Sequence, residues 1–349
     1  MKSSFKCALL LSTLSLAASQ AYADGPYFYA LVDGGMASSK ISGGSTSTSK
    51  TEFVTGGVVP TFVGMKLDKT MDGITVGVAL EQGFTLNTPS GSNYYFFGNG
   101  DAFNRQKNIF VKSAAGTVVL GVQPNIAFGN VLMGDPRGGS NYGSSLAMID
   151  GNGGLGTVDN ASISYTAPTV SGLTVAGQYV PESKSNGAKG SRLIATYAAG
   201  DMKLGVSTYT DTATGVKDST GTIISGNYKL GSFTLKGISA SQKSSTFTSA
   251  LTTTGVGGEY ALSSKLALDV GYYNAKSSVS NFKVDTTAAG LYYNITKDLK
   301  FYAQYAVVEN KGSANSVGWN FAGPTVFPYD FNAGKKATTL NAGLILAYF

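Results

Sequence analysis

The sequence predicts an all-β protein: a transmembrane antiparallel β-barrel of about 16 strands. Three observations support this fold class. Segments of about ten residues with alternating apolar and polar character recur along the chain, as in membrane barrels. Short turns alternate with longer polar loops. Beyond the N-terminal segment no apolar run reaches the length of about 18 residues that a membrane-spanning helix needs.

The alternation is clearest in residues 266–273, where Leu266, Leu268 and Val270 fall on one face and Ala267 and Asp269 on the other. A period of two indicates strands with one apolar and one polar face. Comparable units occupy 25–36, 54–67, 73–86, 104–113, 116–124, 158–167, 172–183, 189–199, 202–212, 222–231, 233–244, 251–262, 265–276, 283–294, 299–310 and 337–348.

The connections between these units indicate how the strands are arranged. Tight turns such as Gly231-Ser232 alternate with longer polar loops, so the turns should lie together at one end of an antiparallel sheet. The expected loops include 37–53, 87–103, 125–157, 213–221 and 311–336.

A soluble β-sandwich is the alternative architecture, but it rarely needs so many long strands in one run. In lipid the sheet must close, because an open edge would leave backbone hydrogen-bonding groups unsatisfied. Aromatic residues near strand ends fit the interface girdles of such barrels. The aromatic residues expected there are Tyr27, Tyr260, Tyr272, Tyr292, Tyr302, Tyr348 and Phe349.

The first 23 residues have the features of a signal peptide. Lys2 and Lys6 precede a short leucine-rich run, and Ala21-Tyr22-Ala23 supplies a cleavage site of small residues. We therefore divide the chain into a signal peptide, 1–23, and a barrel, 24–349. Cleavage would remove Cys7, the single cysteine.

Composition excludes several kinds of function. The chain has no His and one Cys, which rules out His-based catalysis and zinc sites built from Cys and His. The lysines are scattered and only three arginines occur, so no basic stripe for nucleic acid is formed. We expect no enzymatic activity, no cofactor and no nucleic-acid partner.

Several short motifs follow one another in a fixed order along the chain: Tyr27-Phe-Tyr-Ala-Leu-Val-Asp-Gly-Gly35, Phe62-Val-Gly-Met-Lys66, Leu80-Glu-Gln-Gly-Phe84, Gly116-Thr-Val-Val-Leu-Gly121, Val158-Asp-Asn-Ala-Ser-Ile-Ser-Tyr165 and the terminal Phe349. In their order and spacing, from about Tyr27 to Phe349, the chain resembles the trimeric general porins of Gram-negative outer membranes, especially the β-proteobacterial type.

The resemblance implies a homotrimer in the outer membrane of a Gram-negative bacterium, in contact with its lipid. It would be a passive diffusion channel for ions and small hydrophilic solutes. It further implies that the third loop, 125–157, folds into the barrel and narrows it, with Asp135, Arg137 and Asp150 as its charged candidates for the constriction. A substrate-selective channel remains an alternative, as does a surface adhesin or structural barrel.

The wall facing this loop departs from the family pattern. Phe62 and Val122 stand where the resemblance leads us to expect arginines. The remaining lumenal candidates are the bases Lys66 and Lys107 and the acids Glu81 and Asp33. Because several wall arginines are missing, we expect weak ion selectivity despite the basic composition.

Overall fold

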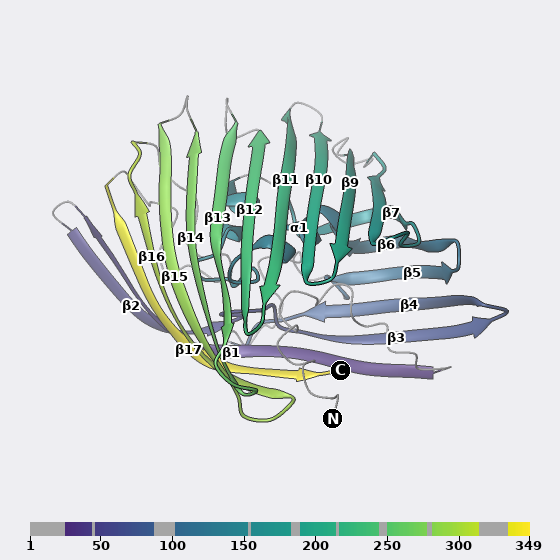
Figure 1. The fold of residues 1–349 in the computed structure, drawn as a ribbon, viewed down its shortest axis with the longest axis horizontal. Coiled ribbons are helices and arrows are strands. Elements are labelled where there is room, and N and C mark those ends of the chain that lie inside the picture. The colour runs from purple at the N-terminus through teal and green to yellow at the C-terminus, as the bar shows by residue number, and fades with distance from the viewer. Residues whose placement is uncertain are drawn as a thin grey trace.

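The computed structural model describes residues 25–43, 46–86, 102–152, 155–182, 189–213, 216–243, 250–277, 281–313 and 334–349. The expected signal peptide, 1–23, lies outside the described residues, as do most of the loops 87–103 and 311–336. The strands enclose a lumen that contains a short helix (Figure 1).

The strands are β1 (Gly25–Gly43), β2 (Thr46–Thr55), β3 (Phe62–Met71), β4 (Ile74–Gly83), β5 (Gln106–Ser113), β6 (Gly116–Pro124), β7 (Val158–Thr166), β8 (Leu173–Val180), β9 (Lys189–Ala199), β10 (Met202–Ala213), β11 (Val216–Leu230), β12 (Phe233–Lys243), β13 (Leu251–Ala261), β14 (Leu266–Ser277), β15 (Phe282–Asn294), β16 (Leu299–Asn310) and β17 (Lys336–Tyr348). Helix α1 (Ile126–Gly134) and the π-helical turn η1 (Ala147–Asn152) lie between β6 and β7.

The sheet is a closed barrel of sixteen antiparallel strands. β2 and β3 both pair with β1, β2 with its second half and β3 with its first, so these two segments form one interrupted strand. The barrel closes where β1 pairs with β17, in a register that joins Ala30 to Tyr348 and Ser42 to Lys336. The predicted fold class is therefore confirmed.

Two of the expected loops are wrong. Residues 37–43 and 46–53 belong to β1 and β2 and pair with each other, and β10 and β11 extend into the predicted loop 213–221. Both stretches are rich in Ser and Thr, which removes the apolar alternation that marks the rest of each strand. The hydrogen-bonded ladder continues regardless, because it depends on the backbone.

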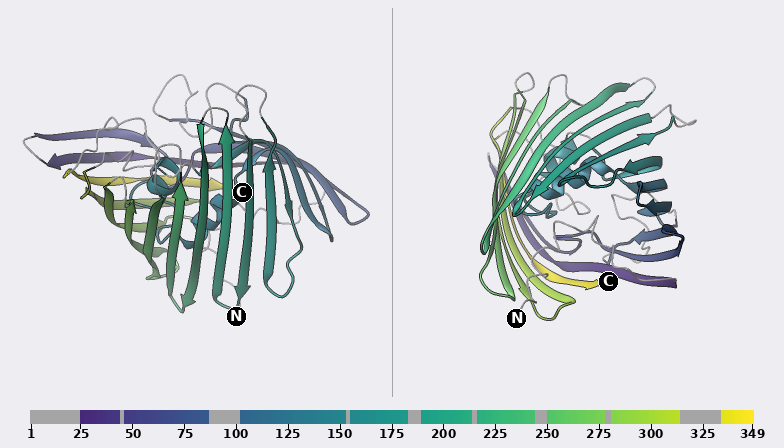
Figure 2. Two further views of the ribbon diagram at one scale, coloured as in Figure 1. Left: turned by 90° about the horizontal axis from the view of Figure 1, so that it is seen from above. Right: turned by 45° about the vertical axis from the view of Figure 1, so that its right-hand side comes forward.

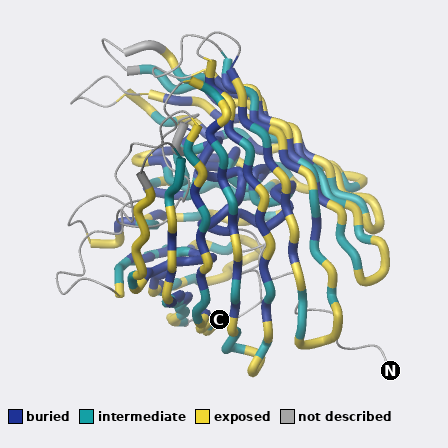
Figure 3. Tube along the Cα trace, turned by 90° about the vertical axis from the view of Figure 1, so that its left-hand side faces the viewer, coloured by how far each residue is buried: buried dark blue, intermediate teal, exposed yellow. Residues whose placement is uncertain are grey.

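The barrel wall has one face toward the outside and one toward the lumen, and successive residues alternate between them (Figure 3). The outward face carries exposed apolar side chains, such as Val63 and Leu67 on β3 and Leu204 and Val206 on β10. The inward face carries glycines, small polar residues and most of the strands' charged groups near the centre. The apolar face outside and the polar face inside are the reverse of the arrangement in a soluble protein, as contact with lipid requires. Among the described residues, no helix is long and apolar enough to cross a membrane.

Helix α1 lies inside the barrel against the wall made by β9, β10, β11 and β12 (Figure 2). Asn125 caps its first turn by accepting a hydrogen bond from the Ala127 amide at 2.9 Å. The buried residues Ala127, Asn130, Val131 and Gly134 form one face at helical spacing. A Cβ at Gly134 would lie 2.3 Å from Ser225 Cβ, so the helix meets β11 closely only because this residue is glycine.

Candidate functional site: the lumen and its inward loop

The segment 125–157 enters the barrel, and Asp135 holds its centre together. Its two carboxylate oxygens accept hydrogen bonds from the backbone amides of Arg137, Gly139 and Ser145 at 2.8–3.1 Å. Ser145 Oγ and, from the wall, Tyr273 Oη also donate to it. Asp135 is completely buried. The structure therefore places this residue inside the barrel but within the packed loop, away from lumenal water.

Arg137 joins the same loop to the wall at β14 and β16. Its Nε donates to Asp269 of β14 at 2.8 Å, and its Nη2 donates to Gln304 of β16 at 2.8 Å. Its Nη1 donates to the carbonyls of Tyr142 and Gly143. All three guanidinium nitrogens therefore donate hydrogen bonds within the protein, and Arg137 is 1% exposed. A buried ion pair of this kind fixes the position of the loop and has little direct contact with permeating ions.

Asp33 organises the gap between β2 and β3, where residues 56–61 leave the wall. Its Oδ2 accepts hydrogen bonds from the Val58 and Val59 amides at 2.7 and 2.9 Å, and Tyr302 Oη donates to its Oδ1 at 2.9 Å. Asp33 is also completely buried. It lies on the inward face, as predicted, but as an anchor for this segment.

The inward loop contacts the segment 56–61 directly. Asn141 Nδ2 donates to the Gly56 carbonyl at 2.6 Å, and Gln304 Nε2 donates to the Gly57 carbonyl at 2.7 Å. The loop therefore crosses the lumen from α1 on β10–β12 to the opposite side of the wall near β1. The narrowing of the pore by this loop, which the family resemblance implied, would depend on this crossing.

Asp150 lies in η1, where the loop turns back toward β7. It is partly exposed and its Oδ1 accepts a hydrogen bond from the Gly156 amide at 2.6 Å. Burial raises the pKa of Asp150 to about 6. Of the three loop candidates, Asp150 is the one with some solvent exposure.

The wall candidates divide between the two faces. Glu81 lies inward, accepting hydrogen bonds from Tyr29 Oη at 2.8 Å and Arg105 Nε at 2.6 Å. Lys66 also lies inward, with its Nζ 3.6 Å from Asp68 and 4.8 Å from the centre of the Phe110 ring. Lys107 is exposed and shares the outward face with Ile109 and Val111, so its side chain does not join this group.

Arg105 was not among the sequence candidates, yet it takes the place of an expected wall arginine. Its guanidinium carbon lies 4.2 Å from the centre of the Phe62 ring, the position where an arginine was expected. Arg105 lies in the predicted strand 104–113, but β5 begins only at Gln106, so the two-residue period of β5 does not assign Arg105 to a face.

The third arginine, Arg192 on β9, is buried between two carboxylates. Its Nη2 lies 2.7 Å from Asp159 Oδ1 and 2.7 Å from Asp211 Oδ1. All three arginines of the chain therefore point inward, and each is paired with a carboxylate: Arg105 with Glu81, Arg137 with Asp269, and Arg192 with Asp159 and Asp211. Positive charge near the loop is balanced locally.

Several inward lysines near the short turns were also not singled out in the sequence. They could have been found by extending the two-residue period from a known inward position, as Lys203 lies two residues before Gly205, which faces α1. These lysines are Lys112, Lys203, Lys229, Lys236 and Lys300.

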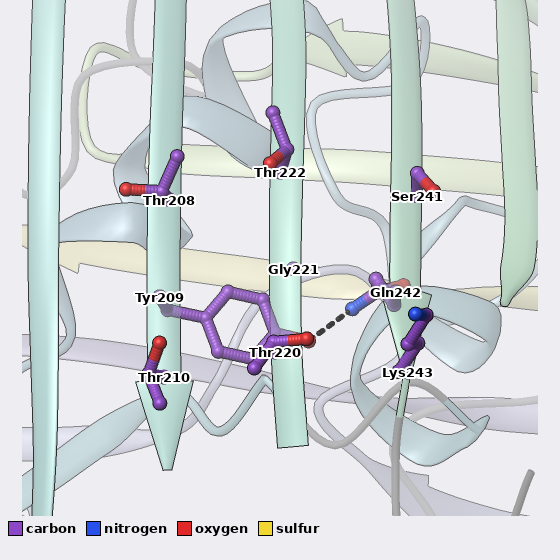
Figure 4. Close-up of a pocket in the computed structure, with 9 residues that line it drawn as sticks. All are labelled: Thr208, Tyr209, Thr210, Thr220, Gly221, Thr222, Ser241, Gln242 and Lys243. Atoms are coloured by element: carbon purple, nitrogen blue, oxygen red, sulfur yellow. Dashed lines mark hydrogen bonds between the residues drawn. The ribbon is translucent and has the colours of Figure 1, made fainter. Parts of the chain in front are cut away.

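A hollow of about 340 Å³ lies near the loop ends of β10, β11 and β12 (Figure 4). Its lining is mainly hydroxyl groups with one lysine, Lys243. Gln242 crosses from this region to the loop, donating to Tyr209 Oη at 2.7 Å and to the Ile149 carbonyl at 2.8 Å. These bonds attach η1 to the wall. Among the described residues, no cluster of His, Cys, Asp and Glu could hold a metal ion.

A closed barrel with outward apolar strands and a loop pinned across its lumen defines a membrane channel. The family model of the Gram-negative porins matches residues 8–313, and this chain belongs to that family. It is an outer-membrane channel for diffusion and not an enzyme. None of the curated proteins compared matches the chain.

Solved structures share the fold. The anion-selective porin from Comamonas acidovorans is 17% identical with a TM-score of 0.80, covering 93% of this chain and 100% of its own. A loop-deletion form of OmpT from Vibrio cholerae is 16% identical with a TM-score of 0.63, covering 94% and 100%. OmpF from Salmonella typhi, in complex with daunomycin, is 11% identical with a TM-score of 0.61, covering 93% and 98%.

Proposed function

We propose that this porin admits small hydrophilic solutes through an aperture bounded by the loop 125–157, filtering mainly by size and with weak ion selectivity. The observation that carries this proposal is the pairing of every arginine with a carboxylate, which leaves little unbalanced charge beside the loop. Paired charges in a pore produce a local transverse field but little net attraction for either sign of ion.

The aperture itself is proposed to lie between the loop and the wall at β1, β3 and β4. Of the charged candidates, Lys66 and Asp150 keep some solvent exposure, while Glu81 lies behind its two partners. Asp33, Asp135 and Arg137 instead fix the shape of the opening, because their hydrogen bonds are all made within the protein. Lys107 has no part in it.

We further propose export with removal of residues 1–23 and assembly as a homotrimer in contact with outer-membrane lipid. The exposed apolar outward face supports contact with lipid. A trimer form of OmpT from Vibrio cholerae, 15% identical with a TM-score of 0.62, is consistent with the assembly. Migration of the purified protein in detergent gels before and after heating tests it, since a lone compact monomer would argue against the trimer.

Conductance in a planar lipid bilayer tests the channel. We expect stable ohmic steps, and a salt gradient should give a reversal potential far below the ideal value for either ion. A strong preference for anions would overturn the weak-selectivity proposal. Absence of stable steps would instead favour the adhesin or structural-barrel alternative.

A further inference from the structure

The half of the lumen between the inward loop and the short turns, here called the turn-side vestibule, has its own charge balance. Its inward positions carry the lysines Lys66, Lys112, Lys203, Lys229, Lys236 and Lys300. Inward carboxylates at this level are fewer: Asp68 pairs with Lys66 and Glu259 pairs with Lys236. Among the described residues, Lys112 and Lys203 have no carboxylate partner in an ion pair. The vestibule therefore has an excess of positive charge that the aperture lacks.

The same vestibule carries aromatic rings on one wall. Tyr27 and Tyr29 on β1 point inward with ring centres 5.7 Å apart, and Phe349 stacks on Tyr29 at 6.2 Å. On the neighbouring strands Lys66 Nζ lies 5.9 Å from the Tyr27 ring centre and also faces the Phe110 ring. Tyr27 and Phe110 are only half-buried, and Phe349 is more than half exposed. A planar apolar group can reach this wall.

Helix α1 contributes an uncharged surface across the lumen. The helix contains no charged residue, and its buried face is directed at β10–β12. Phe128 and Leu132 lie off that face and remain partly exposed, and a Cβ added to Gly129 would meet no atom within 4 Å. The strand order places β1 and β3 across the barrel from β10 and β11. A solute between them meets apolar surface on one side and rings with lysines on the other.

From this arrangement we infer that the turn-side vestibule binds small carboxylates that carry an aromatic or similar apolar group. The excess lysines attract the carboxylate, and the rings of β1 and β5 supply contact for the apolar part. This inference rests on the proposed diffusion function, because a solute must enter the lumen to reach the site. It adds a preference among solutes of similar size that the aperture alone would not give.

The test uses the mature protein in planar bilayers, with benzoate and acetate as probes at equal concentration and ionic strength. Binding is measured from current noise and partial block, with each probe added to either side in turn. We expect benzoate to bind at least about threefold more tightly than acetate. Equal binding of the two probes would overturn the inference.

Variants separate the site from general effects on the barrel. Tyr27→Leu and Lys203→Gln should each weaken benzoate binding at least about threefold, with Tyr27→Leu leaving acetate unchanged. Matched controls lie on the outward face: Phe28→Leu, the neighbour of Tyr27, and Lys107→Gln should leave both probes unchanged. Equal effects of Tyr27→Leu and Phe28→Leu would also overturn the inference.

Two kinds of failure are distinguishable. If the protein gives no stable conductance steps, the proposed channel function fails and the site fails with it. If conductance is normal but benzoate shows no advantage over acetate, only the vestibule site fails.

Discussion

Within the described residues, the chain leaves the barrel wall toward the lumen in two places, and each excursion is held by one buried aspartate. At 56–61 Asp33 accepts hydrogen bonds from two backbone amides and a tyrosine hydroxyl. At 125–157 Asp135 accepts hydrogen bonds from three amides and two hydroxyls. The first excursion is short, returns directly to the wall and needs few contacts. The second crosses the lumen and needs anchors at both ends. The longer segment loses more conformational entropy when it is ordered, and it needs more hydrogen bonds to offset that loss.

The largest expected effect is on the longer excursion. Asp135→Ala leaves three amides and the Tyr273 hydroxyl without their acceptor, and should lower the free energy of unfolding by about 3–5 kcal/mol. The thermal unfolding midpoint, followed by circular dichroism in detergent, measures this. Single-channel conductance should rise or become noisy as the loop loosens. An unchanged midpoint with unchanged conductance would show that Asp135 does not pin the loop.

A somewhat smaller effect is expected at the other anchor. Arg137→Met leaves Asp269 buried with Tyr292 as its remaining partner and should cost about 3 kcal/mol. The double variant Arg137→Met with Asp269→Leu should recover most of this loss, because no buried charge is then left alone. The same unfolding measurement applies. If the double variant is no more stable than Arg137→Met alone, the stability is lost through poorer packing and not through the unpaired charge of Asp269.

The shorter excursion should be less sensitive. Asp33→Asn keeps the size of the side chain but removes the charge that the Val58 and Val59 amides face, and should cost about 1–3 kcal/mol. The loop should stay attached through Arg137, so conductance should change less than in Asp135→Ala. Equal destabilisation by the two variants would contradict the difference between the excursions.

The smallest effect concerns pH. The pKa of Asp150 is about 6 in the folded protein, above its ordinary value, because burial disfavours the charged form. The folded state therefore holds the proton more tightly, and the stability of this part of the loop should fall as pH rises through the interval between about 4 and 6. Hydrogen exchange at the Leu155 and Gly156 amides, corrected for intrinsic rates, measures this. Asp150→Asn should remove the difference between pH 5 and pH 7.

The strands were largely predictable because period-two alternation is a local property. The exceptions have physical reasons. Serines and threonines hide the ends of β1 and β2. The break at 56–61 is marked locally by Gly56-Gly57 and Pro60, but its position is held by Asp33 and by Tyr302 far along the chain. The same alternation could have corrected the aromatic girdle, since Tyr27, Tyr292 and Tyr302 point inward. It also explains why Lys107, one residue out of phase with Gln106 and Asn108, faces outward.

The candidate site was harder to predict, because burial is not a local property. Asp33, Asp135 and Arg137 are charged residues in the expected loop and wall, yet each has a partner more than 100 residues away: Tyr302 for Asp33, Tyr273 for Asp135 and Asp269 for Arg137. Charge and position alone do not distinguish an exposed pore-lining group from a buried anchor. Arg105 illustrates the converse, since it reaches Phe62 from the position just before β5, where the alternation of the observed strand has not yet begun.

The junction of β1 with β17 has a consequence for biogenesis. Its partners are separated by almost the full chain, as Ser39 Oγ and Thr339 Oγ1 are 3.0 Å apart across 300 residues. Until the last strand arrives, the edges of β1 and β16 expose unpaired backbone groups that can pair with other chains. Closure over such a sequence separation is also entropically slow. A truncated chain that lacks β17 would be unable to close the barrel and prone to aggregate. Only a chain that has reached its last strand can therefore fold into the closed barrel.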